Sequence, residues 1–190
     1  MSLRARTVRN IGIVAFLQVF ATAVNTVTLI ILARLLTPFD FGIVGIVSFV
    51  LGIIGQFSDF GLGPAVIQRR KEVEEALYTG GAMRIMIALV LFIVTFFLAP
   101  YAAMLFRTAE VTWVIRIAAV MFFLNSAGFV STNRLTKELE FGRLAYVTVV
   151  LSVVSASTSI TLAWLGFSYW SMIFGPMVGT VASLVALYIV

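Results

Sequence analysis

Six long apolar runs constrain this chain more than any other feature of its sequence. Each run has about the 20 residues that a helix needs to cross the hydrocarbon core of a bilayer. Short polar breaks separate the runs, and the predicted spans are residues 11–33, 41–58, 85–106, 113–130, 144–164 and 169–190. A segment inside a bilayer must satisfy its backbone hydrogen bonds internally, so these runs are expected to be helical. The sequence therefore predicts an all-α, polytopic membrane protein built as a six-helix bundle.

The composition excludes several classes of chemistry. Hydrophobic residues make up 62% of the 190 positions and charged residues 11%, whereas soluble domains are about half apolar. The chain has no cysteine and no histidine, which excludes disulfides, thiolate nucleophiles and imidazole acid–base or metal chemistry. No motif for a metal, a nucleotide or another cofactor is visible. We therefore predict that the protein is not an enzyme, carries no metal and no cofactor, and binds no nucleic acid.

The tripeptide Asp-Phe-Gly occurs twice, at residues 40–42 and 59–61, on either side of the second predicted span. A helix rises about 1.5 Å per residue, so the two aspartates are roughly 28 Å apart, close to the hydrocarbon thickness. Asp40 follows Pro38 and is placed to accept free amide hydrogens at the start of that helix. The tripeptides are therefore predicted to mark the two faces of the membrane. A protein kinase is excluded because its glycine-rich loop and catalytic loop are missing.

The distribution of basic residues predicts the orientation in the membrane. Arg34, Arg107 and Arg116 fall at or near one side. The other side carries ten basic residues, namely Arg4, Arg6, Arg9, Arg69, Arg70, Lys71, Arg84, Arg134, Lys137 and Arg143. Because basic residues accumulate on the cytoplasmic side, both termini are predicted to be cytoplasmic. The first 23 residues imitate a cleavable secretory signal, but their apolar run continues too far for one.

Small and polar residues recur at helical spacing inside three spans. The stripes are Gln18, Thr22 and Asn25; Gly45, Ser48, Gly52 and Gln56; and Thr148, Ser152, Ser155 and Ser159. The second and third stripes are predicted to be packing surfaces, as is the Gly175–Gly179 pair, because small residues let helices approach closely. Amides in a span more often face a water-filled cavity than lipid. Gln18, Asn25 and Gln56 are therefore candidate substrate-binding residues, with helix packing as the alternative.

Three blocks of sequence resemble a known family. They are "ARLLTPFDFG" at residues 33–42, "FSDFGLGPAVIQRR" at 57–70 and "NRLTKELEFGRLA" at 133–145. Together they resemble the polysaccharide exporter branch of the multidrug/oligosaccharidyl-lipid/polysaccharide flippase superfamily, the group of the Wzx-type O-antigen flippases. The likeness covers essentially the whole chain. It departs at Phe39, where an acidic residue is expected, and at Glu140 and Gly142, where the family often has basic residues.

The resemblance implies a function and a partner. Such proteins move an undecaprenyl-diphosphate-linked oligosaccharide across the inner membrane by alternating access, in lipopolysaccharide or exopolysaccharide biosynthesis. Two six-helix lobes surround their central cavity. The 190 residues would supply the N-terminal lobe of this MATE-like fold, so residues 1–190 are expected to be one lobe of a longer protein. The implied partners are the lipid-linked oligosaccharide, membrane lipid and a second lobe.

A lipid diphosphate needs cations or hydrogen-bond donors along its path through the membrane. Arg34 and Arg116 are the candidate cations near the outer half of the bilayer, and snorkelling to the outer interface is the alternative for each. Two other functions remain open: a cation-coupled drug antiporter of the same superfamily, which would need an intramembrane carboxylate, and a non-transporting membrane scaffold. A prenyl-lipid transferase is disfavoured because the sequence has no carboxylate cluster for magnesium and diphosphate.

Overall fold

The structure of the chain is a computed structural model that describes residues 3–59, 73–138 and 140–189. The elements in these ranges are α-helices: α1 (Leu3–Leu35), α2 (Pro38–Asp59), α4 (Val73–Phe106), α5 (Val111–Ala118), α6 (Met121–Ala127), α7 (Phe129–Lys137), α8 (Phe141–Trp164) and α9 (Trp170–Ile189). Within the described ranges, six stretches are long and apolar enough to cross a membrane: Gly12–Leu35, Pro38–Phe57, Thr79–Phe106, Val111–Lys137, Phe141–Trp164 and Trp170–Ile189. The predicted all-α fold with six spans is confirmed, and the chain is a multi-pass membrane protein.

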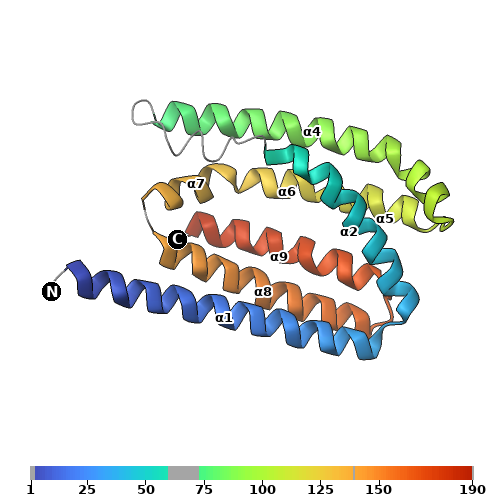
Figure 1. Ribbon diagram of the computed structural model, residues 1–190, viewed down its shortest axis with the longest axis horizontal. Coiled ribbons are helices and arrows are strands. Elements are labelled where there is room, and N and C mark those ends of the chain that lie inside the picture. The colour runs from blue at the N-terminus through green and yellow to red at the C-terminus, as the bar shows by residue number, and fades with distance from the viewer. Residues whose placement is uncertain (1–2, 60–72, 139, 190) are drawn as a thin grey trace.

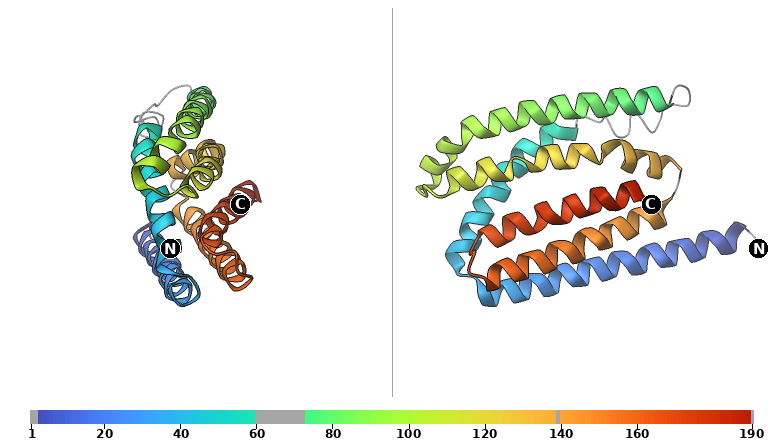
Figure 2. Two further views of the ribbon diagram at one scale, coloured as in Figure 1. Left: turned by 90° about the vertical axis from the view of Figure 1, so that its right-hand side faces the viewer. Right: turned by 180° about the vertical axis from the view of Figure 1, so that it is seen from behind.

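The helices lie roughly side by side (Figure 1). α8 packs between α1 and α9, and α4 packs along α5, α6 and α7. α2 crosses one side of the other helices obliquely and packs on α4 and α5 (Figure 2). The turns at residues 36–37, 107–110 and 165–169 lie together at one end, here named the three-turn end. The opposite end, which holds both termini and the connection between α7 and α8, is named the terminal end.

Three helical stretches are longer than the spans predicted from sequence. α1 begins at Leu3 and α4 at Val73, whereas their spans were expected to begin at residues 11 and 85. The fourth span, expected over residues 113–130, extends over Val111–Lys137 in three segments. Hydropathy marks only the part of a helix that is apolar, whereas the backbone hydrogen bonds continue into polar residues. The breaks in the fourth span carry tighter bonds to the third preceding residue, such as Phe122 N to Ala119 O at 3.1 Å.

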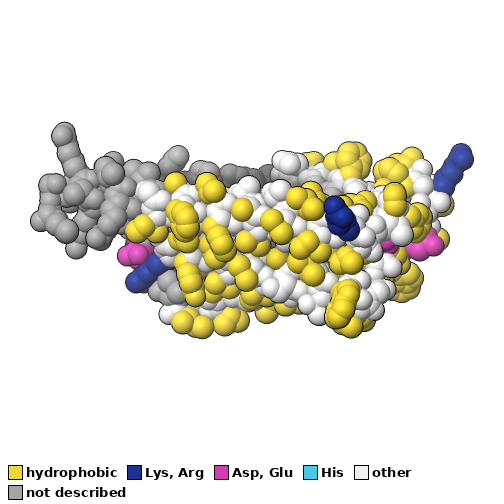
Figure 3. Space-filling model, turned by 90° about the horizontal axis from the view of Figure 1, so that it is seen from below, with side chains coloured by type: hydrophobic (Ala, Val, Ile, Leu, Met, Phe, Trp, Pro, Cys, Tyr) yellow, Lys and Arg dark blue, Asp and Glu magenta, His cyan; other side chains and the backbone are white. Residues whose placement is uncertain are grey.

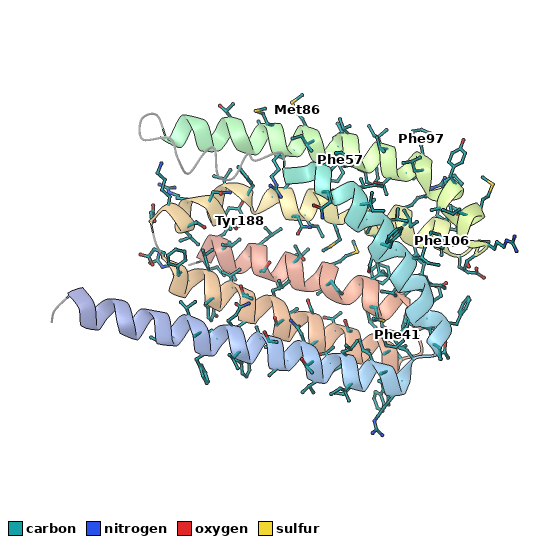
Figure 4. The ribbon with its side chains drawn as sticks, viewed as in Figure 1. Phe41, Phe57, Met86, Phe97, Phe106 and Tyr188 are labelled. Carbon is teal, nitrogen blue, oxygen red and sulfur yellow. The ribbon has the colours of Figure 1, made fainter. Side chains whose placement is uncertain are left out.

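The core lies where α2 crosses the layer of helices. Ile43 and Val47 of α2 are buried against Val111, Val114 and Ile115 of α5. The outer surface is apolar as well: Met86 and Phe97 on α4 point away from the other helices and are 68% and 67% exposed (Figure 4). Hydrophobic side chains also cover much of the face seen in Figure 3, on which few charged groups lie. A surface of this kind suits contact with lipid tails.

Asp40 joins two of the turns at the three-turn end. It is 5% exposed and lies in the first turn of α2. One carboxylate oxygen, Oδ2, accepts hydrogen bonds from Thr37 N at 2.8 Å and Thr37 Oγ1 at 2.7 Å. Thr37 Oγ1 in turn accepts from Asp40 N at 3.3 Å, which completes a capping box. The other oxygen, Oδ1, accepts from Tyr169 N, in the turn before α9, at 3.1 Å. Asp40 therefore caps the start of α2, as predicted, and it also links α2 to the turn before α9.

Glycines let α9 approach α8 closely. A Cβ atom added to Gly179 would lie 2.8 Å from Leu151 O and 3.0 Å from Ser155 Cβ, both on α8. A Cβ added to Gly175 would lie 2.9 Å from Ser159 Cβ. Real Cβ atoms essentially never come under 3.0 Å, so a larger residue at either position would force the surrounding atoms to shift. The predicted packing role of the Gly175–Gly179 pair and of the α8 stripe is therefore seen in the structure.

Candidate functional site

A recess between α1, α8 and α9 contains the first of the candidate amides. Its volume is about 170 Å³. It is lined by Asn25, Thr28, Leu29, Leu32, Ser155, Ala156, Ser159, Met172 and Pro176. Asn25 is exposed on α1, and the two serines come from the face of α8 that packs on the glycines of α9. The recess is thus an apolar pocket with an amide and hydroxyls from different helices.

Pro176 changes the backbone hydrogen bonding of α9 beside this recess. Pro176 lies inside α9 and has no N–H, so it cannot donate the usual helical hydrogen bond to the carbonyl of Met172, four residues earlier. Both residues line the recess. The usual helical donor to that carbonyl is therefore missing. Sequence reasoning did not include Met172, Ser155 or Ser159 among the site residues.

Gln18 lies in a second, shallower recess along α1. It is lined by Gln18, Val19, Thr22, Ala23, Thr26 and Val27, all from α1, with a volume of about 450 Å³. The hydroxyls of Thr22 and Thr26 donate to the carbonyls of Gln18 and Thr22, both at 2.9 Å. The helix itself thus satisfies these hydroxyl donors. Gln18 and Asn25 lie on the same helix but line different recesses.

Gln56 lies on α2, in the stripe that also contains Gly45, Ser48 and Gly52. All four residues are exposed. A Cβ added to Gly45 or Gly52 would have nothing within 4 Å. Among the described residues, this stripe therefore does not pack on another helix, unlike the stripe on α8. Small side chains permit close approach, but they do not determine which partner approaches.

The two candidate arginines lie apart from the amides. Arg34 is exposed in the last turn of α1, where its charge complements the negative end of the helix dipole. Arg116 lies on α5 and is half-buried. Its Nε donates to Phe96 O at 3.3 Å, and its guanidinium carbon lies 4.3 Å from the centroid of the Phe96 ring. Neither arginine lines the recesses that contain Gln18 and Asn25.

Acidic residues make no cluster in the described part of the chain. No group of three or more histidine, cysteine, aspartate or glutamate residues is placed to hold a metal ion there. The recesses instead offer amides and hydroxyls between apolar walls, which suits hydrogen bonding to neutral polar groups.

Comparison with known proteins identifies relatives of the chain. A family model described as "Polysaccharide biosynthesis protein" matches residues 31–190. The succinoglycan biosynthesis transport protein ExoT of Rhizobium meliloti (strain 1021) is 30% identical over all of this chain and 38% of its own length. The teichuronic acid biosynthesis protein TuaB of Bacillus subtilis (strain 168) is 31% identical over 51% of this chain and 20% of its own length. The lipopolysaccharide biosynthesis protein WzxC of Escherichia coli (strain K12) is 22% identical over 77% of this chain and 30% of its own length.

The matches cover more of this chain than of its relatives. No solved structure matches the chain. The chain spans 20–38% of the length of the curated relatives it matches. The family model covers most of the chain, including all of the spans after the first. The six apolar helices and this match agree with the family resemblance carried by the three sequence blocks, and the chain belongs to the polysaccharide biosynthesis protein family of membrane proteins.

Proposed function

We propose that the chain is one lobe of an exporter that moves lipid-linked oligosaccharide across the inner membrane. The observation that carries this proposal is the likeness of the entire chain to a protein named for succinoglycan biosynthesis transport. In the proposed mechanism, a second lobe of the same longer protein forms the other wall of a central cavity. The two lobes alternate between access from the cytoplasmic and the outer side, and no covalent chemistry is needed.

The chemistry of the recesses supports a glycan as the substrate. Sugar hydroxyls both donate and accept hydrogen bonds. Asn25 offers donors and an acceptor, and Ser155 and Ser159 offer hydroxyls, within one recess. Amides exposed to hydrocarbon would be costly, so Gln18, Asn25 and Gln56 favour a cavity that admits water or substrate. The apolar walls around them suit the lipid part of such a substrate.

The diphosphate of the substrate requires positive charge. We propose Arg34 and Arg116 for this role, since a guanidinium can bind phosphate oxygens in a bidentate manner. Arg34 is the better placed of the two. Its side chain is exposed, and it lies nine residues, or about 14 Å, further along α1 than Asn25. The Nε of Arg116, by contrast, already donates to a protein carbonyl.

Replacement of the recess amide tests the proposed function. In the full-length protein, Asn25→Leu is expected to lower export of surface polysaccharide about tenfold, because sugar hydroxyls would lose hydrogen-bond partners. Export is measured as surface polysaccharide in cells that lack their own exporter, with protein abundance determined by immunoblot. Gln18→Leu and Gln56→Leu are tested in the same cells.

Thr161→Leu provides the matched control, because Thr161 is an exposed polar residue on α8 that lines neither recess. Its hydroxyl donates to Ser157 O at 2.8 Å, within its own helix. This variant is expected to export normally. Normal export by all three amide variants at normal abundance would contradict the proposed role of these residues.

The proposed orientation has a separate test, since the chain contains no cysteine of its own. A cysteine replacing Ala109, exposed in a turn of the three-turn end, is expected to react with an impermeant maleimide added to intact cells. A cysteine replacing Ser2 is expected to react only after the membrane is permeabilised. The opposite pattern would mean that the three-turn end is cytoplasmic.

A further inference from the structure

Pro100 creates an unusual hydrogen-bonding need in α4. The helix continues through this proline, from Val73 to Phe106. In an α-helix, the N–H of residue 100 would donate to the carbonyl of residue 96. Proline has no N–H, so the Phe96 carbonyl cannot receive that bond. This part of α4 lies within a stretch apolar enough to cross a membrane, where lipid offers no replacement donor. The carbonyl therefore needs a donor from elsewhere in the protein.

Arg116, on the neighbouring helix α5, supplies that donor. Its Nε donates to Phe96 O at 3.3 Å. Its guanidinium carbon also lies 4.3 Å from the centroid of the Phe96 ring and 5.2 Å from that of the Trp113 ring. The same arginine thus contacts both the backbone and the side chain of Phe96. Cation–π contacts of this length offset part of the cost of keeping a charge beside apolar surface.

We infer that Arg116 is a bridging residue that completes the backbone hydrogen bonding of α4 at Pro100 and holds α5 against α4. The role goes beyond the proposed transport function, because it needs no substrate. It accounts for an arginine inside the otherwise apolar segment at residues 112–124. It also differs from snorkelling, in which the guanidinium would extend into water instead of donating to a protein carbonyl.

The pairing of Arg116 with Pro100 makes the inference testable by rescue. Arg116→Met keeps a long side chain but removes the donor and the charge, and is expected to lower the thermal unfolding midpoint of the purified full-length protein by roughly 5 °C. Pro100→Ala restores an N–H that can donate to Phe96 O. In that background, Arg116→Met is expected to lower the midpoint by less than half as much, since only the contacts with the rings are lost.

Two further variants define the control and the alternative. Arg107→Met removes an exposed arginine next to the end of α4 and is expected to leave the midpoint unchanged. Arg116→Lys retains a charged donor that can reach the carbonyl and is expected to preserve most of the stability. Equal losses from Arg116→Met with and without Pro100→Ala would overturn the inference. If Pro100→Ala does not fold, the comparison of lysine with methionine decides the question, and equal losses from these two variants would overturn it.

Discussion

Replacement of Gly179 by alanine is expected to destabilise the protein by about 3 kcal/mol, because α9 could no longer lie as close to α8. The added Cβ would meet Leu151 O at 2.8 Å and Ser155 Cβ at 3.0 Å. A backbone carbonyl cannot rotate away as a flexible side chain can, so the helices themselves must separate. Gly175→Ala is expected to act similarly, and the double variant more strongly. Thermal unfolding and size-exclusion chromatography of the purified protein in detergent measure the effect.

Gly142→Ala is the matched control for these variants. Gly142 also lies in a helix, near the start of α8, but a Cβ added there has nothing within 4 Å. This change is expected to leave stability unchanged or to raise it by up to about 1 kcal/mol, the usual gain of alanine over glycine in a helix. Wild-type stability of Gly179→Ala would show that α8 and α9 are not in the close contact described.

Replacement of Asp40 by alanine is also expected to have a large effect and to lower the free energy of unfolding by about 3 kcal/mol. The carboxylate accepts hydrogen bonds from Thr37 N, Thr37 Oγ1 and Tyr169 N. Asp40 is 5% exposed, so little water can replace it as an acceptor. The variant loses the cap of α2 and leaves donors in two turns without a partner. The expected result is a lower yield of folded protein and a lower midpoint of thermal unfolding.

Thr37→Ala separates the two roles of Asp40. This variant removes the hydroxyl of the capping box, but the Asp40 carboxylate can still accept hydrogen bonds from the backbone N–H of residue 37 and from Tyr169 N. We therefore expect it to cost about 1 kcal/mol, the usual value of a cap. A link to the turn before α9 requires Asp40→Ala to be clearly worse than Thr37→Ala. Equal losses from the two variants would mean that Asp40 serves only the start of α2.

The fold could be predicted from sequence because the bilayer imposes its thickness on every span. Apolar length alone was sufficient to place six spans, but it missed polar ends such as the beginning of α4 and the breaks within the fourth span. Local signals also worked where donor and acceptor are close in sequence. The capping role of Asp40 follows from its position after Pro38, whereas its hydrogen bond to Tyr169, 129 residues away, depends on how the turns are arranged in space.

The candidate site was harder to predict, because similar patterns lie in different surroundings. The stripes of small residues on α2 and α8 look alike in sequence. One is open among the described residues, and the other lies under Gly175 and Gly179. Arg116 illustrates the same difficulty, since a lone arginine in a span is equally compatible with a ligand and with a protein acceptor. The residue that explains its contact, Pro100, lies on another helix.

The packing of α1 has a consequence for how the protein is made. Among the described helices, α8 is the main partner of α1. More than a hundred residues separate the end of α1 at Leu35 from the start of α8 at Phe141. When α1 leaves the ribosome and enters the bilayer, its partner has not yet been synthesised. It must persist there without that partner, which its apolar residues permit everywhere except along the stripe of Gln18, Thr22 and Asn25. Closure of the bundle onto α1 is therefore a late step of biosynthesis.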